Sequence, residues 1–237
     1  MIANLGNILG KQALRHHFCS LLRLGLAGQS SPLKGLQMGS MFFLPWLGDA
    51  YLTGGILPKR TLVLGESYYE SDGQLNQEST RDFVKWTIGG KWRRRFFTGA
   101  AIAFLNRYPT PDEKTRFWHA VLHYTFVQKP VGQKPRDRPS RELWSEGSGP
   151  FVEVLETYRP EFVLVLGKEL WNHLPVAVAG PRVEGAELNE TRKYPTGRGY
   201  FALAYGIKHP TSFGFNGRNW HSFIFQAMQF AERYPVS

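Results

Sequence analysis

Two short polar segments, each following an apolar run, contain the residues best suited to chemistry. They are Gly65–Glu70 (GESYYE) and Lys208–Phe213 (KHPTSF). The imidazole of His209 could donate a hydrogen bond to a developing anion. The carboxylate of Glu66, or the hydroxyl of Ser67 beside it, could position a water molecule. Either segment alone is also typical of an ordinary turn, so the interpretation depends on the two occurring together.

Aromatic and hydroxyl side chains next to these groups favour a nucleotide as the ligand. Tyr68 or Tyr69 could stack on a planar base. Thr211 and Ser212 offer backbone N–H groups and hydroxyls to phosphates, and Phe213 is large enough to fill a gap in a base stack. Cleavage of the bond between a base and its deoxyribose puts positive charge on the sugar and negative charge on the base. These groups together would suit that reaction on a flipped nucleotide.

Basic residues are concentrated in one quarter of a chain that is basic as a whole. The formal net charge is +10 over 237 residues. Residues 81–141 contain fourteen Lys or Arg and four Asp or Glu, so this stretch has a net charge of +10 and the remainder balances to zero. Such a surplus can be only a solvated face, but its concentration favours contact with the phosphates of DNA. Lys208 is a further candidate for phosphate contact.

Three consecutive arginines form the densest part of the basic stretch. Arg93, Arg94 and Arg95 could bind the phosphate backbone. The neighbouring Trp92 or Phe97 would anchor the segment to the core. The alternative is an ordinary solvated run of charges, and the flanking aromatic residues favour the DNA-binding interpretation.

The single cysteine, Cys19, limits the metal and redox chemistry open to the chain. One thiol excludes a disulfide framework, a cysteine-based zinc site and a four-cysteine iron–sulfur cluster. Four histidines lack a metal-like spacing with carboxylates, and we interpret them as structural or pocket-lining: His119, His123, His173 and His221. We expect no metal and no organic cofactor.

The first forty residues differ in character from the rest. Residues 1–48 contain no Asp or Glu, and their only uninterrupted apolar stretches are too short to cross a bilayer. Three interpretations stay open: a basic extension that packs on the domain or touches DNA, a targeting peptide, and an over-long translation start ahead of Met38 or Met41. We expect a basic N-terminal extension over residues 1–40 and one catalytic domain over residues 41–237, in a cytoplasmic, nucleoid-associated monomer.

Apolar runs alternate with helical patterns along the rest of the chain. Four runs have the composition of buried strands: Thr61–Gly65, Ala120–Val127, Phe162–Gly167 and Tyr200–Tyr205. Helices are predicted over Asn76–Ile88, Phe151–Tyr158, Lys168–Leu174 and Gly217–Arg233, and a loop over Lys129–Ser140. The alternation predicts an α/β fold, a three-layer α/β/α sandwich with a central, mainly parallel, four-stranded sheet. In such sheets the site lies at the carboxyl ends of the strands, where both polar segments fall.

The order and separation of these segments resemble the signature motifs of the uracil-DNA glycosylase superfamily. That pattern has a water-activating loop after the first strand and a His-Pro-Ser-type loop after the last. Phe162–Pro175 resembles its third-strand signature, and Phe117–Trp144 its base-recognition strand. Phe43–Gly48 is similar to the opening of an uncharacterised bacterial branch. The resemblance covers roughly residues 42–233. It implies that His209 stabilises the departing base, that Thr211 replaces a more usual serine, and that Phe213 intercalates.

Two departures from the superfamily pattern affect the expected substrate. Ser67 stands at the water-activating Asp or Asn position, so the negative charge is expected from Glu66 first, or from Glu70 or Asp72 just beyond it. Otherwise catalysis would rely mainly on His209. Thr125 stands where an asparagine reads uracil, and one hydroxyl cannot replace the paired donor and acceptor of an amide. The resemblance therefore implies a DNA glycosylase for uracil or for a larger, modified pyrimidine. A glucosylated hydroxymethylcytosine of phage DNA would be one such base, excised in antiviral defence or DNA repair.

Two other classes of protein remain open at this point. One is a catalytically inactive module of the same fold that binds unusual DNA, which Ser67 and Thr125 would favour. The other is a different α/β hydrolase or nucleotide-binding enzyme. A serine-nucleophile version is disfavoured because no Gly-x-Ser-x-Gly motif surrounds Ser67. A phosphate-loop version lacks the glycine-rich Lys-Ser/Thr motif.

Overall fold

The computed structural model describes residues 41–53, 55–134, 137–186, 190–197 and 199–232. The chain divides into two units, residues 1–38 and 39–237, and all described residues belong to the second. The expected basic extension over residues 1–40 lies outside the described residues. Within the described ranges, no helix combines the length and the apolar composition needed to cross a membrane.

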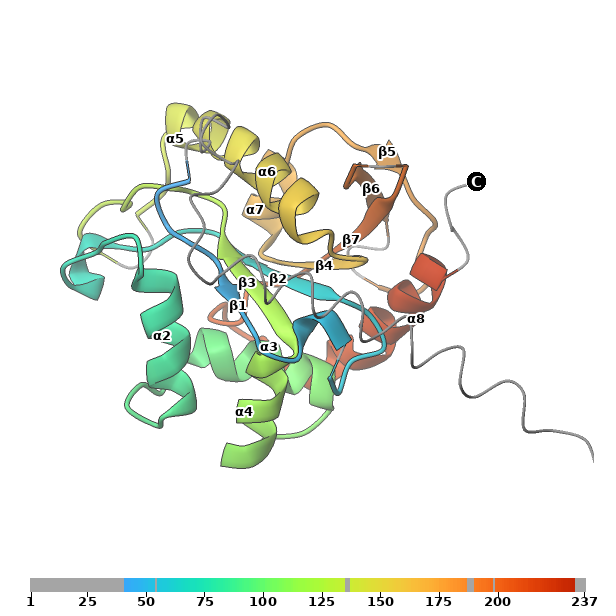
Figure 1. Ribbon diagram of the computed structural model, residues 1–237, viewed down its shortest axis with the longest axis horizontal. Coiled ribbons are helices and arrows are strands. Elements are labelled where there is room, and N and C mark those ends of the chain that lie inside the picture. Colours follow the sequence, from blue (N-terminus) through green and yellow to red (C-terminus); the bar gives the residue numbers. More distant parts are fainter. Residues whose placement is uncertain (1–40, 54, 135–136, 187–189, 198, 233–237) are drawn as a thin grey trace, which may run out of the picture. The chain divides into compact units, whose positions relative to one another are not determined.

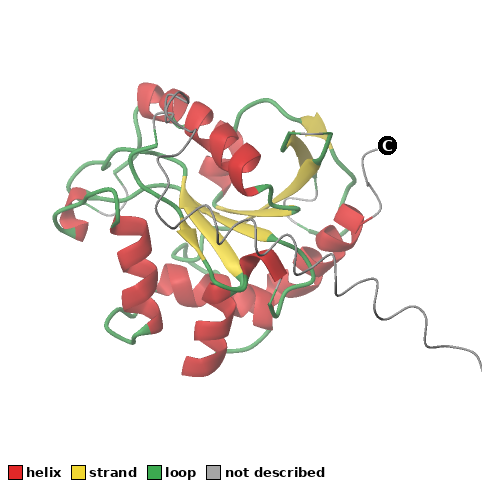
Figure 2. Cartoon of the chain, in the orientation of Figure 1, coloured by secondary structure: helices red, strands yellow, loops and turns green. Residues whose placement is uncertain are grey.

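The described residues form a mixed α/β structure built on a seven-stranded sheet in the order β1-β3-β2-β4-β7-β6-β5 (Figures 1 and 2). The strands are β1 (Trp46–Leu47), β2 (Thr61–Gly65), β3 (Val121–Thr125), β4 (Phe162–Leu166), β5 (Val178–Ala179), β6 (Thr191–Pro195) and β7 (Phe201–Ile207). The four central strands, β3, β2, β4 and β7, are parallel to their neighbours. β1 pairs antiparallel at one end, and β6 and β5 at the other.

The four predicted strands are confirmed as the centre of the sheet, and the predicted strand number of four is wrong. The missed strands lie outside the parallel centre. β1 and β5 contain only two residues each, which is too short for a periodic signal. β6 reads TRKYP, and its charged and proline residues suit a strand near the sheet edge rather than a buried run.

Helices pack on both faces of the sheet (Figure 1). Their bounds are α2 (Ser79–Ile88), α3 (Arg95–Leu105), α4 (Pro111–His119), α5 (Arg141–Glu146), α6 (Ser148–Tyr158), α7 (Lys168–His173) and α8 (His221–Glu232), with short 3-10 turns at Tyr51–Thr53, Glu70–Asp72 and Gly217–Trp220. The predicted helices in the second half of the chain agree within a few residues. Helix α6 begins at Ser148, three residues before the predicted start at Phe151.

Two hydrophobic clusters separate the sheet from its helices, one on each face. Successive strand residues point to opposite faces, so Val63 and Leu164 pack with α2, α3, α4 and α8. Leu64 and Val165 pack with α5, α6 and α7 on the other face. The strands are buried on both sides, which explains their continuous apolar composition.

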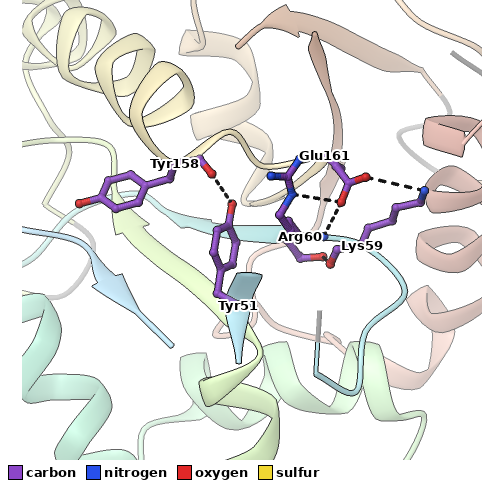
Figure 3. Close-up of polar contacts among 6 residues, drawn as sticks. Tyr51, Lys59, Arg60, Tyr158 and Glu161 are labelled. Carbon is purple, nitrogen blue, oxygen red and sulfur yellow. Dashed lines mark hydrogen bonds and ion pairs between the residues drawn. The ribbon is translucent and has the colours of Figure 1, made fainter. Parts of the chain in front are cut away.

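The amino ends of the central strands are fastened by polar contacts (Figure 3). The Glu161 carboxylate accepts hydrogen bonds from the Arg60 backbone N–H (3.0 Å) and Nε (3.3 Å), and Lys59 Nζ lies 3.9 Å from it. The Tyr51 hydroxyl donates to the Tyr158 carbonyl oxygen (3.1 Å). These contacts join the segment before β2 to the segment before β4.

Parallel pairing brings the opposite, carboxyl ends of the central strands together. Gly65 at the end of β2 is paired with Thr125 at the end of β3. Leu166 at the end of β4 is paired with Ile207 at the end of β7. The segments that follow these strands therefore meet at one edge of the sheet, as predicted for the two polar segments.

Candidate active site

A pocket of about 860 Å³ lies at the carboxyl ends of β2, β3, β4 and β7. Its walls come from the segments after these strands and from the N-terminal part of α3. Twelve of the thirteen residues predicted for the site line it: Glu66, Ser67, Tyr68, Tyr69, Arg94, Arg95, Thr125, Lys208, His209, Thr211, Ser212 and Phe213. Arg93 lies outside it. Residues from both ends of the domain thus form one cavity.

His209 is held in one orientation by the turn that follows it. Its Nδ1 lies 2.8 Å from the Thr211 hydroxyl oxygen and accepts the Thr211 backbone N–H at 3.2 Å. A backbone N–H can only donate, so Nδ1 is unprotonated and the proton of the neutral ring is on Nε2. Burial, helped by the positive charge of Arg138, lowers the pKa of His209 to about 4. At neutral pH the ring is therefore an uncharged N–H donor.

Glu66 is a buried carboxylate directly after β2. It is only 8% exposed, and Arg138 Nη1 lies 3.3 Å from its Oε1. Burial raises the pKa of the Glu66 carboxyl, and the neighbouring Arg138 opposes that rise. Arg138 comes from the proline-rich loop after β3, which the sequence did not identify as part of the site.

Gly167 keeps the space between His209 and Glu66 open. A Cβ on this glycine would lie 3.6 Å from His209 Cδ2 and 3.9 Å from Glu66 Oε2, so the two side chains flank the same point. The residue has a φ of 138°, a conformation that favours glycine. The hydrogen-bond donor and the carboxylate consequently border the same part of the pocket.

Two polar atoms near the pocket have no hydrogen-bond partner among the described residues. They are the Ser67 hydroxyl oxygen and His123 Nε2, both buried. Buried polar groups in folded proteins are nearly always hydrogen-bonded, because an unmet one costs about 1–3 kcal/mol. The prediction that His123 is structural or pocket-lining is confirmed, because it lines the pocket.

The two tyrosines after β2 differ in their surroundings. The Tyr68 ring packs edge-on against Phe43 and Phe83, with centroids 5.1 and 4.9 Å away. Its hydroxyl donates to Thr80 Oγ1 at 3.1 Å, and burial raises its pKa to about 12. Tyr68 therefore belongs to the core and forms part of the pocket wall, with its ring already packed. Tyr69 is only partly buried and also lines the pocket.

Phe96 is an aromatic pocket residue that the sequence did not single out. Its ring lies between the partly buried His209 and the buried His123, with centroids 5.6 Å and 5.7 Å away. A Cβ on Gly65 would come within 3.1 Å of the Phe96 ring, so the ring lies directly against the backbone at the end of β2. Phe96 also lines the pocket and is only partly buried, so its ring can contact a planar group bound there.

The arginine run begins helix α3 at the edge of the pocket. Arg94 forms an ion pair with Asp72 (2.8 Å) and lies over the Trp92 ring at 4.1 Å. Trp92 packs against the core and Phe97 is buried in it, which confirms the predicted anchoring. Arg93 and Arg95, exposed and without an ion pair in the described part of the chain, line an adjacent cavity of about 280 Å³.

The loop after β7 presents Phe213 to solvent at the pocket rim. Ser212 N–H donates to the His209 carbonyl oxygen at 2.9 Å, which closes a turn around Pro210. Phe213 follows this turn and is 98% exposed. An aromatic ring that contacts so little of its own protein is available to a partner.

Among the described residues, no group of three or more His, Cys, Asp or Glu side chains is arranged to hold a metal ion. Comparison with protein-family models gives no match for this chain, and comparison with curated proteins gives none either. The relation to the uracil-DNA glycosylase superfamily therefore stays a prediction from the motifs. The fold and the pocket are the observations on which function has to be argued.

Proposed function

We propose that this protein is a DNA glycosylase of the uracil-DNA glycosylase superfamily. It flips a non-canonical base into the pocket, hydrolyses the N-glycosidic bond and leaves an abasic site. The observation that carries the proposal is the facing pair at Gly167, where a neutral N–H donor, His209, and a buried carboxylate, Glu66, flank one volume. Glycosidic-bond cleavage needs these two groups on opposite sides of the reacting centre.

The chemistry divides between the two residues. As the C1′–N bond breaks, its electron pair goes to the departing base, and His209 Nε2–H stabilises that negative charge by hydrogen bonding. The Glu66 carboxylate stabilises the positive charge on the sugar and orients a water molecule. The water oxygen then bonds to C1′ and passes its proton to the carboxylate. Ser67, which follows Glu66 directly, also lines the pocket.

The pocket rim supports the binding of DNA with a flipped nucleotide. Phe213 would fill the gap in the base stack, and the exposed Arg93 and Arg95 would contact phosphates, together with Lys208 and the Thr211 and Ser212 turn.

The pocket volume bears on the size of the base. About 860 Å³ lies within the range of sites that take drug-sized ligands, ~300–1,000 Å³, and exceeds the needs of a single pyrimidine. Thr125, in place of a longer side chain, leaves part of this room. An enlarged pyrimidine such as glucosylated hydroxymethylcytosine of phage DNA is therefore the favoured substrate, which implies antiviral defence. Uracil, with a role in DNA repair, is the smaller alternative.

A base-release assay tests the proposal. The full chain and a His209→Ala variant are incubated with DNA containing uracil, hydroxymethylcytosine, glucosylated hydroxymethylcytosine or ordinary bases, and alkali-sensitive sites are counted. We expect release from one modified DNA and a loss of about 10²–10³-fold in the variant, as when one anion-stabilising donor is removed. His119→Ala, a histidine outside the pocket, is the matched control. Activity that persists with a chelator separates the reaction from metal-dependent cleavage.

A second candidate function is recognition of unusual DNA without catalysis. Ser67, at the position where an acidic or amide side chain would activate water, favours it. Tight binding of modified DNA with no base released from any substrate, and with equal binding by His209→Ala, would establish this alternative and overturn the glycosylase proposal.

A further inference from the structure

A second, smaller cavity lies beside the candidate active site, and Arg95 lines both. This side groove has a volume of about 280 Å³ and runs between helix α3 and the loop that leads from β7 to α8. Its α3 wall contains Arg95, Thr98 and Ile102, whose spacing is that of one helix face. From Arg95 to Ile102 the helix rises about 10 Å, at ~1.5 Å per residue. The groove therefore leads away from the pocket along α3.

The loop that forms the other wall is packed closely on α3. A Cβ on Gly99 would lie only 2.7 Å from Pro210 Cβ and 3.1 Å from Phe215 Cε1, and a Cβ on Gly217 would lie 2.9 Å from the Gly99 carbonyl oxygen. Pro210 follows His209 directly in the chain. The side groove is thus preformed, and one of its walls continues the loop that presents His209.

Positive charge is concentrated at the end of the side groove next to the pocket. Arg93 and Arg95 are exposed and have no ion pair within the described ranges, whereas Arg94 between them pairs with Asp72. No acidic residue is found among the described residues that line the groove. A guanidinium presents several N–H donors in a fixed fork that matches a phosphate. This end of the groove therefore suits the backbone of a nucleic acid.

An exposed aromatic ring stands at the other end of the side groove. Tyr108, three residues after α3 ends, lines the groove and is 71% exposed. The partly buried Phe215 lines it as well. Exposed aromatic rings beside a positive groove are the surfaces on which unpaired bases stack. A base inside a duplex already has a neighbour on each face, so only an unpaired base can use Tyr108.

We propose that the side groove binds a single DNA strand next to the flipped nucleotide, with phosphates on Arg93 and Arg95 and an unpaired base on Tyr108. The placement of the flipped nucleotide rests on the proposed glycosylase function, and the inference narrows its substrate to DNA that is unpaired beside the target. In a duplex the two arginines still reach phosphates, but the contact with Tyr108 is lost.

The binding of ordinary single strands and duplexes to the full chain tests the role of Tyr108. By fluorescence anisotropy, Tyr108→Ala is expected to weaken single-strand binding about tenfold and to leave duplex binding within about twofold. Tyr108→Phe retains the ring and should bind both like the wild type. Tyr200→Ala, which removes another exposed tyrosine at the amino end of β7, is the matched control and should change neither. Unchanged single-strand affinity in Tyr108→Ala, or an equal loss for duplexes, would overturn the inference.

A trimming experiment locates the stacked base relative to the target. Single strands with one glucosylated hydroxymethylcytosine are shortened by one nucleotide at a time from each end, and Kd is measured for the wild type and Tyr108→Ala. The groove length of about 10 Å equals the rise of about three stacked nucleotides, at ~3.4 Å each. We expect a drop of about tenfold in wild-type affinity near that position on one side, absent from Tyr108→Ala. An equal drop in both proteins, or none, would overturn the inference.

Base release measured on the same strands separates this inference from the proposed function. Base release without any effect of Tyr108 on single-strand binding would overturn the strand site alone. Binding that depends on Tyr108, with no base released from any DNA, would overturn the glycosylase proposal and leave the strand site standing.

Discussion

Arg138 connects the two residues at the centre of the proposed reaction. Its guanidinium lies 3.3 Å from Glu66, and its charge contributes to lowering the pKa of both the Glu66 carboxyl and His209. Glu66 must be ionised to stabilise a cation, and His209 must be neutral to keep its orientation by accepting at Nδ1. Both conditions are lost as the pH falls. Arg138 therefore extends the active range toward acid.

Replacement of Arg138 by methionine is predicted to move the acid limb of the pH–rate profile to higher pH. Without the positive charge, the pKa of Glu66 rises further and that of His209 rises toward its ordinary value, so both changes act in the same direction. On a one-proton limb, each pH unit of movement lowers the rate about tenfold at a fixed acidic pH. Profiles of kcat/KM for Arg138→Met and for Arg141→Met, an exposed arginine outside the pocket, provide the comparison. If the acid limb of Arg138→Met is unchanged, the titration of Glu66 and His209 is not what lowers the rate at acid pH.

At the residue scale, the sequence predicted the polar residues of the site better than the residues that form the walls of the pocket. His209, Glu66 and Phe213 follow the ends of predicted strands. Their residue type and their position in the chain therefore both pointed to the site. Phe96 was hidden within a run noted for its charges, and Arg138 within a proline-rich loop. Which loop reaches the site depends on three-dimensional packing, for which a single sequence carries no periodic signal.

At the scale of elements, the edge of the sheet opposite the site is where β2 and β4 are held together. Glu161 accepts two hydrogen bonds from Arg60 and pairs with Lys59 across this edge (Figure 3). The backbone N–H of Glu161 in turn donates to the Arg60 carbonyl oxygen at 2.8 Å. The contacts fix the register of the two strands whose far ends present Glu66 and Gly167.

Glu161→Ala is predicted to lower the free energy of unfolding by about 1–2 kcal/mol, since the substitution removes a half-exposed carboxylate that accepts two hydrogen bonds from Arg60 and pairs with Lys59. Urea unfolding measures the change. Base release by the folded variant should match the wild type, because the substitution lies at the other end of the sheet. Glu156→Ala, on the exposed face of α6, should leave stability within about 0.5 kcal/mol. A larger effect at Glu156 than at Glu161 would contradict this account.

Element prediction worked where burial gives a strong pattern. The central strands are apolar on both faces, and their composition alone identifies them. α4, which begins at Pro111, was not predicted, although its N-cap Thr110 and Glu113 form a capping box whose residue types stand in the sequence. α3 was missed because its first turn consists of residues interpreted as a phosphate-binding run. The edge strands β1 and β5 form because they pair with neighbouring strands. A segment of two residues carries no sequence pattern from which that pairing could be predicted.

At the scale of the whole molecule, positive charge gathers beside the pocket mouth. Arg93 and Arg95 stand at the start of α3, exposed and without ion pairs in the described part of the chain. Their contribution to DNA binding should be electrostatic and independent of the base. Such contacts release counterions, so affinity falls as salt rises.

Arg93→Gln is predicted to weaken binding of modified and ordinary duplexes by the same factor. The slope of log K against log salt should become less steep by about one. Fluorescence anisotropy over a salt series measures both quantities. Arg159→Gln, at the amino edge of the sheet, is the matched loss of one positive charge and should leave the slope unchanged. If log K depends on log salt with the same slope in Arg93→Gln and the wild type, Arg93 does not contact the phosphates, and the DNA binds elsewhere on the protein.

The order of the strands in the sheet has a consequence for biosynthesis. β7 is the last strand in the chain, yet it is inserted between β4 and β6, and His209 follows it directly. A chain still on the ribosome, translated only as far as β6, already contains Glu66 and most of the arginines, but lacks His209 and Phe213. The proposed activity can therefore arise only once nearly the whole domain has been synthesised.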